Sequence, residues 1–309
     1  MTPLASLEGV DKSFGKTTAL DELSFAVPEG SVCGLLGPNG SGKTTAIRAL
    51  LGLTRVDSGQ ISLFGAPPGS RGFRRAVAST GSLLEGSALY GRASAWQNLK
   101  IAAATRQVLL DEDELLRLLS LVGLVDRFRE RVRGYSLGMR QRLGIAVALV
   151  GRPRLVILDE PTNGLDPAGI VEIRELIRSL PASGTTVLVS SHLLAEVQEM
   201  CDRVTIVDHG RTVADGTLAE VTGSVATTSG WRIRVSPAEL ERACLALSEV
   251  GLGHRSTPDG VIEVSGPVED GSQLSCLLAG SGVFVAELSP LKPSLEGTFL
   301  RLTGEGRAQ

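Results

Sequence analysis

The residues GPNGSGKT at positions 37–44 follow a short apolar run and precede a segment with helical character. They match the pattern G-x-x-x-x-G-K-[ST], in which glycines let backbone N–H groups turn inward around phosphate groups. The start of the following helix adds the positive end of its dipole at the same place. The segment therefore predicts a strand–loop–helix unit that binds nucleotide phosphates. We expect the Lys43 ammonium to bridge the β- and γ-phosphates and the Thr44 hydroxyl to hold Mg²⁺.

A second apolar run, LVIL at positions 155–158, ends in the two acidic residues Asp159 and Glu160. Open α/β sheets bind their ligands at the carboxyl ends of the strands, so we expect both carboxylates beside the phosphate loop. Asp159 is expected to hold Mg²⁺ through water. Glu160 is the candidate to polarise the attacking water, because phosphoryl transfer needs a positioned base rather than a covalent intermediate.

Three further segments resemble the motifs of ABC ATPases. The residues YSLGMRQR at 135–142 resemble the signature sequence, and NGLD at 163–166 resembles the D-loop. His192, after two serines, resembles the H-loop histidine. All three occur in the order of the family, and the resemblance covers about residues 4–222. The chain is thereby identified as a member of this family, an ATPase subunit that hydrolyses ATP when two cassettes close on each other.

The resemblance implies that two cassettes pair head to tail and complete each other's sites. Ser136 and the backbone of Gly138, at a helix N-terminus, would reach the γ-phosphate of ATP held by the partner cassette. His192 would contact the γ-phosphate and steady the attacking water. Phe14 stands where an aromatic residue, most often tyrosine, stacks on adenine in this family.

The sequence departs from the commonest family pattern at several positions. The segment 81–99 resembles the Q-loop region, but Glu85 replaces the usual glutamine, whose position in the family touches Mg²⁺ or the water. A carboxylate can coordinate Mg²⁺ at least as well as an amide. The signature has Leu137 and Met139 where glycine and glutamine are usual. These departures, with the run PSLEGTFLRLTG at 293–304, resemble the antibiotic- and drug-efflux branch, the bacitracin- and daunorubicin-resistance type.

The expected cofactors are ATP and Mg²⁺, and the expected site residues fall into three groups. The catalytic residues are Glu160, His192 and Lys43. The nucleotide-binding residues are Phe14, Gly37, Pro38, Asn39, Gly40, Ser41, Gly42, Lys43, Thr44, Thr45, Ser136 and Gly138. The metal-binding residues are Thr44, Asp159 and Glu85.

Strands alternate with helices up to about residue 222, which predicts an α/β fold with a mainly parallel sheet. With the resemblance, this is a P-loop NTPase cassette, with an antiparallel β subdomain and a helical subdomain at about 86–150. Residues 223–230 are small and polar and are expected to form a linker. Residues 231–309 are expected to form a small α+β domain of βαββαβ order that serves pairing or partner docking.

Composition narrows the class of partner. The net charge is −3 and the pI about 5.8, which does not favour a nucleic-acid or anionic-membrane binder. The four cysteines lack the paired spacing of a zinc or redox site. The first eight residues lack the features of a signal peptide, and the longest apolar runs fall far short of the roughly 20 residues that span a bilayer. We therefore expect membrane contact only through a partner.

The sequence thus favours an ATP-hydrolysing subunit at the cytoplasmic face of the membrane. It would drive export of an antibiotic, drug or other small amphiphile through a separate polytopic permease. It would pair with a second ABC cassette, which we take to be a second copy of this chain. An importer subunit stays open, because the direction rests only on the resemblance. A soluble ABC ATPase of ribosomes or DNA also stays open, although those resemble tandem or interrupted cassettes and this chain has one phosphate loop. Glu160 and His192 argue against a regulator without turnover.

Overall fold

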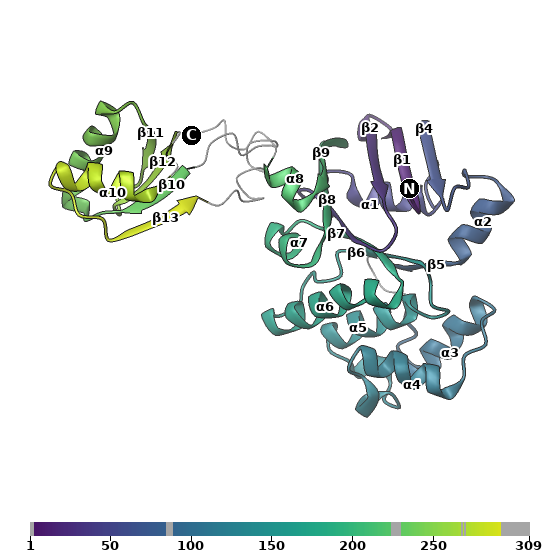
Figure 1. Cartoon of the computed structure of the whole chain (residues 1–309). Coiled ribbons are helices and arrows are strands. Elements are labelled where there is room, and N and C mark those ends of the chain that lie inside the picture. The colour runs from purple at the N-terminus through teal and green to yellow at the C-terminus, as the bar shows by residue number, and fades with distance from the viewer. Residues whose placement is uncertain (1–2, 85–88, 224–229, 267, 269, 292–309) are drawn as a thin grey trace. The chain divides into compact units, whose positions relative to one another are not determined.

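The computed structural model describes residues 3–84, 89–223, 230–266, 268 and 270–291. The chain divides into two compact units between Leu218 and Ala219, just before the expected boundary at residue 222 (Figure 1). The helix α8 (Leu218–Gly223) lies at this division. Each unit is described by itself.

A six-stranded sheet forms the centre of the first unit. Its strands are β3 (Val32–Leu36), β5 (Thr80–Leu83), β6 (Leu155–Asp159), β7 (Thr186–Ser191), β8 (Arg203–Asp208) and β9 (Arg211–Thr217). Their order is β5-β6-β7-β3-β8-β9, with parallel pairing except between β8 and β9. Every residue of β3, β6 and β7 is buried, as expected for strands covered on both faces. The α/β class is confirmed, and β8 and β9 form an antiparallel hairpin.

A second, antiparallel sheet packs near the first. It contains β1 (Ala5–Phe14), β2 (Thr17–Val27) and β4 (Ser58–Leu63), in the order β2-β1-β4. One buried cluster joins Leu7 of β1, Leu35 of β3 and Ile47 of the helix α1 (Lys43–Leu50). Each such side chain contributes about 1.5–3 kcal/mol by leaving water. This core therefore anchors α1, which begins within the phosphate loop.

Helices make up the rest of the first unit. They are α2 (Arg71–Ala78), α3 (Ala95–Thr105), α4 (Glu112–Leu121), α5 (Leu137–Ala148), α6 (Pro167–Ser179) and α7 (Leu194–Met200), with short 3-10 turns at Val125–Arg127, Val132–Gly134 and Pro181–Ser183. In Figure 1, α3, α4 and α5 lie on the side of the central sheet away from β1, β2 and β4. These three helices lie within the segment expected to form the helical subdomain.

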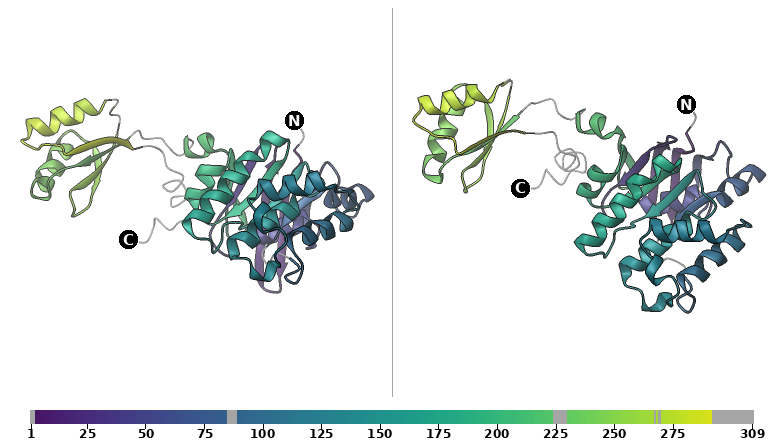
Figure 2. Two further views of the ribbon diagram at one scale, coloured as in Figure 1. Left: turned by 90° about the horizontal axis from the view of Figure 1, so that it is seen from below. Right: turned by 60° about the horizontal axis from the view of Figure 1, so that its bottom comes forward.

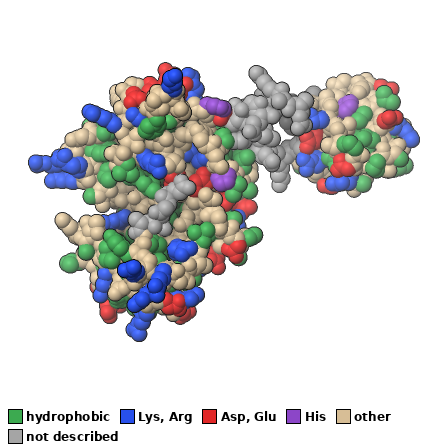
Figure 3. All heavy atoms as spheres, turned by 180° about the vertical axis from the view of Figure 1, so that it is seen from behind, with side chains coloured by type: hydrophobic (Ala, Val, Ile, Leu, Met, Phe, Trp, Pro, Cys, Tyr) green, Lys and Arg blue, Asp and Glu red, His purple; other side chains and the backbone are tan. Residues whose placement is uncertain are grey.

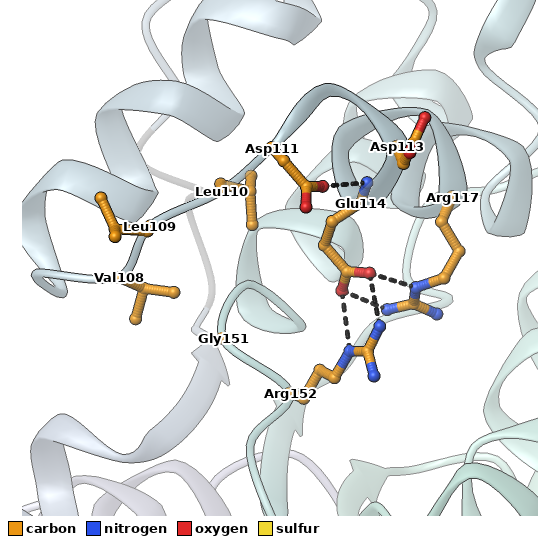
Figure 4. Close-up of a pocket in the computed structure, with 9 residues that line it drawn as sticks. All are labelled: Val108, Leu109, Leu110, Asp111, Asp113, Glu114, Arg117, Gly151 and Arg152. Carbon is orange, nitrogen blue, oxygen red and sulfur yellow. Dashed lines mark hydrogen bonds and ion pairs between the residues drawn. The ribbon is translucent and has the colours of Figure 1, made fainter.

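Asp111, with Glu114 three positions later, has the sequence spacing of a capping box at the start of α4, which predicts reciprocal hydrogen bonds between the two residues. The Asp111 carboxylate accepts a hydrogen bond from the N–H of Glu114 at 2.8 Å, so the expected N-cap is confirmed. The expected reciprocal half of a capping box is wrong, because the Glu114 carboxylate binds two guanidinium groups instead (Figure 4). The distances from Glu114 Oε2 to Arg117 Nε and to Arg152 Nη2 are both 2.8 Å. Charge-assisted bonds of this kind outcompete a neutral backbone donor.

The second unit has the order βαββαβ. Its elements are β10 (Gly230–Arg234), α9 (Leu240–Glu249), β11 (Gly253–Ser256), β12 (Val261–Ser265), α10 (Gly271–Gly280) and β13 (Glu287–Leu291), with a 3-10 turn at Pro237–Glu239. The sheet is antiparallel, with the order β11-β12-β10-β13. Both helices lie on one face of it (Figure 2), and the core between them includes Ile233, Leu247, Ile262 and Leu278. The small α+β domain is confirmed, while the run 293–304 lies outside the described residues.

No helix within the described ranges is long and apolar enough to span a bilayer. On the face of the first unit shown in Figure 3, acidic and basic side chains are interspersed.

We expect the Glu114 pairs to stabilise the first unit in a pH-dependent way. Hydrogen bonds from Arg117 and then Arg152 lower the pKa of Glu114 from 4.5 to about 2. Because the folded-state pKa is lowered, the contribution is fully present above pH 4.5 and is lost as the pH falls towards 2. Glu114→Gln should cost about 1 kcal/mol at pH 7, since both guanidinium groups are partly exposed.

Urea unfolding of the parent, Glu114→Gln and the exposed control Glu175→Gln tests this expectation. The difference between parent and Glu114→Gln should shrink between about pH 5 and pH 3. A difference that stays constant over that range would contradict the assigned pairs.

Candidate nucleotide site

Residues 37–44 run from the end of β3 into α1, and two glycines set their path. A Cβ on Gly37 would lie 2.2 Å from the Val207 carbonyl oxygen. Gly42 has φ 108°, and a Cβ there would lie 2.5 Å from the Ala19 carbonyl oxygen. Any side chain at either position would therefore displace the backbone. No side chain caps α1, so the N–H groups of its first turn can bind phosphate oxygens.

Lys43 lies across this loop and is 5% exposed. Its ammonium donates to the carbonyl oxygens of Gly37 at 2.8 Å and Pro38 at 3.1 Å. It also lies 3.4 Å from Glu160 Oε1. The loop carbonyls thus hold a buried cation at the mouth of the phosphate cradle.

The buried carboxylate of Asp159 lies next to the loop at the end of β6. Its Oδ1 accepts hydrogen bonds from Ser190 Oγ at 2.6 Å and Thr44 Oγ1 at 3.3 Å. Its Oδ2 is buried and has no hydrogen-bond partner among the described residues. Leaving such an oxygen without a partner costs about 1–3 kcal/mol.

These groups fit Mg²⁺. Magnesium prefers hard oxygen ligands and is commonly held by one or two carboxylates together with substrate phosphates and water. Asp159 Oδ2 and the Thr44 hydroxyl supply such oxygens beside the phosphate loop. No group of three His, Cys, Asp or Glu side chains in the described part of the chain could hold a metal alone.

Glu160 has a left-handed backbone conformation. Its φ is 49°, in a region that non-glycine residues rarely adopt. The Ser190 hydroxyl accepts its N–H at 2.9 Å and so stabilises that conformation. Its Oε2 lies 2.8 Å from His192 Nδ1, and its side chain is 14% exposed. The carboxylate is thus held between Lys43 and His192 with a small part open to solvent.

The structure brings together the expected residues of 37–45, Asp159, Glu160 and His192. Within the loop, Asn39 and Gly40 are exposed, and Thr45 is half-buried in α1. Ser190 was not among the expected site residues, although it bonds both acids. The signal that could have identified it was a pair of serines, Ser190 and Ser191, at the end of a buried strand with an apolar centre.

The signature residues lie elsewhere in the first unit. Ser136 caps α5 by accepting the N–H of Met139 at 3.2 Å, and its side chain is exposed. The Leu137 side chain packs over the backbone of Gly164, with Cδ2 3.0 Å from where a Cβ would stand. No hydrogen bond or ion pair found among the described residues links Ser136 or Gly138 to the phosphate loop. One chain therefore leaves the signature surface uncovered.

Phe14 ends β1 and is 54% exposed. The Lys12 ammonium lies 5.3 Å from its ring centroid, close enough for a cation–π contact. The exposed ring can accept a nucleotide base by stacking. Glu85 lies outside the described residues.

Two cavities lie away from this site. One of 460 Å³ is lined by residues around Glu114 and Arg152 (Figure 4), and one of 650 Å³ lies beside Arg106 and Arg154. Neither is lined by a residue of the phosphate loop. An open backbone cradle binds phosphates through N–H groups, so the nucleotide site does not require a deep cavity.

The chain is similar in sequence and in fold to known proteins. A family model described as ABC transporter matches residues 20–163. An uncharacterised ABC transporter ATP-binding protein, YdbJ of Bacillus subtilis (strain 168), is 39% identical over 97% of this chain and 96% of its own length. The daunorubicin resistance ATP-binding protein DrrA3 of Streptomyces coeruleorubidus is 35% identical over 98% of this chain and 96% of its own. A solved ATP-binding subunit of an ABC transporter superposes with a TM-score of 0.64 at 30% identity, over 72% of this chain and 92% of that one.

Proposed function

The chain belongs to the ABC transporter ATP-binding proteins, and from this premise we propose that it hydrolyses Mg-ATP at a site shared by two cassettes. The observation that carries the proposal is the position of the Glu160 carboxylate, between the Lys43 ammonium and the His192 imidazole. Phosphoryl transfer is catalysed mainly by positioning and by electrostatic stabilisation, and these three groups supply both.

Each residue has a distinct part in this proposal. Backbone N–H groups within residues 39–45 and the Lys43 ammonium bind the phosphates, and Phe14 stacks on the base. Thr44 and Asp159 hold Mg²⁺, which neutralises charge on the β- and γ-phosphates when bound. Glu160 takes a proton from the attacking water, and His192 orients that carboxylate through Nδ1.

The second cassette supplies the remaining contact. Ser136 and Leu137, at the start of α5, are exposed, and a helix N-terminus favours an anion. In a head-to-tail pair, this surface would cover the γ-phosphate held by the partner's loop. Hydrolysis would then remove the contacts that keep the pair closed.

We further propose that this cycle drives export of an antibiotic, drug or similar amphiphile. The relative DrrA3 is named for daunorubicin resistance, and its similarity extends through the second unit of this chain. A separate polytopic subunit would form the path across the membrane, with this chain bound at its cytoplasmic face. The second unit would serve pairing or docking to that subunit.

Glu160→Gln tests the assigned base. The variant should bind ATP and form a closed dimer, because the amide keeps the shape of the carboxylate. Its hydrolysis should fall about 100-fold or more, since an amide cannot accept the proton. Phosphate release and light scattering with ATP measure both effects.

The exposed Glu112→Gln should match the parent in both measurements. Turnover of Glu160→Gln at the parental rate would show that the base is another group.

Co-purification tests the membrane partner. The tagged chain, expressed in its own host, should retain a polytopic membrane protein, and amphiphilic drugs should stimulate ATPase activity of that complex. Retention of ribosomal proteins or DNA instead would contradict the transport proposal.

Deletion of residues 231–309 should weaken the complex, and a deletion that leaves it intact would rule out a docking role for the second unit.

A further inference from the structure

Glu196, on α7, is a buried carboxylate that the proposed chemistry does not use. The residue is 4% exposed. Its Oε2 accepts hydrogen bonds from Thr162 Oγ1 at 2.7 Å and from Ser191 Oγ at 2.9 Å. Its Oε1 is buried without a hydrogen-bond partner among the described residues. A buried carboxylate is costly, and an apolar residue of similar volume is often as stable or more so. Fold stability alone therefore does not account for an acid here.

The two hydroxyl groups belong to the segments that carry Glu160 and His192. Thr162 follows Glu160 by two positions and is itself buried. Ser191 directly precedes His192, and its hydroxyl also accepts the N–H of Leu193 at 3.0 Å. The Ser191 hydroxyl thereby holds the backbone on both sides of His192. One carboxylate oxygen joins both segments.

Helix α7 is fixed against the strand that leads to the phosphate loop. A Cβ on Gly34 of β3 would lie 2.9 Å from both Val197 Cγ1 and Cys201 Sγ. The missing side chain at Gly34 lets α7 lie directly on β3. Ser191 also accepts the N–H of Gly37 through its carbonyl oxygen at 3.3 Å. The position of Glu196 is thus fixed relative to the phosphate loop.

We propose that Glu196 is a positioning residue that fixes the Glu160 and His192 segments relative to each other. Its two hydrogen bonds maintain the 2.8 Å contact between His192 Nδ1 and Glu160 Oε2 during turnover. Among the described residues, no hydrogen bond or ion pair links Glu196 to the phosphate loop. The inference rests on the proposed function, in which Glu160 activates the water.

Two substitutions separate positioning from folding. Glu196→Leu keeps approximate volume and removes both hydrogen bonds. It should lower kcat about 10- to 100-fold, because small misplacements of catalytic groups have effects of that size. The KM for ATP should stay within about twofold, since the phosphate loop is intact. Glu196→Gln should keep kcat within about threefold, because its carbonyl oxygen can accept both hydroxyl groups.

Thr162→Val removes the hydroxyl that donates to Glu196 Oε2 and should also lower kcat without changing KM. Glu199→Leu, the same change at an exposed residue of α7 that pairs with Arg174, should match the parent in kcat and KM. Steady-state phosphate release and thermal unfolding of each full-length variant give kcat, KM and Tm.

Parental kcat in Glu196→Leu would overturn the proposal. The proposal would also be overturned if kcat and Tm fell together, and to a similar extent, in Glu196→Leu, Glu196→Gln and Thr162→Val. That result would indicate a purely structural role. Parental hydrolysis by Glu160→Gln is a separate outcome that refutes the proposed base, whatever the Glu196 variants show.

Discussion

The Glu160 carboxylate, held between the Lys43 ammonium and the His192 imidazole, is the interaction on which the site depends. Three strands must meet for it to form: β6 delivers the acid, β3 leads to the lysine and β7 leads to the histidine. Parallel pairing of adjacent strands puts their carboxyl ends at one edge, so the topology brings these groups together. The positive φ of Glu160 is tolerated because the Ser190 hydroxyl binds its N–H.

Much of this arrangement could be predicted from local sequence. The runs at 32–36 and 155–158 are apolar throughout, and a strand buried on both faces needs that pattern. The glycines at 37 and 42 mark close backbone approaches, which the structure shows against Val207 and Ala19. Capping by Asp111 follows from its short polar side chain before an apolar periodic segment.

What could not be predicted depends on residues far apart in the chain. Glu114 has the spacing of a capping box, but Arg152, which lies 38 positions away, and Arg117 bind its carboxylate. Ser190 and Glu196 have no motif of their own, and their partners become evident only when β6, β7 and α7 are packed together. Sequence periodicity reports burial on a face, but not which buried polar groups bind each other.

The same geometry explains why one chain is an incomplete enzyme in this account. The phosphate loop and both acids lie at one edge of the sheet, whereas Ser136 is exposed on the helical subdomain, and no hydrogen bond among the described residues links it to them. In the proposed pair, a facing copy would bring its own signature to the γ-phosphate. Nucleotide binding then becomes an interaction between chains, and hydrolysis can release it.

Mixing two inactive variants tests this claim most directly. Lys43→Ala removes the cradle cation and Ser136→Arg blocks the signature, so each homodimer should lack ATPase activity. A mixed dimer holds one site with both residues intact, and an equal mixture should recover about a quarter of the parental rate if the two sites act independently. Activity that stays absent on mixing, or full activity of Ser136→Arg alone, would contradict a site shared between two chains.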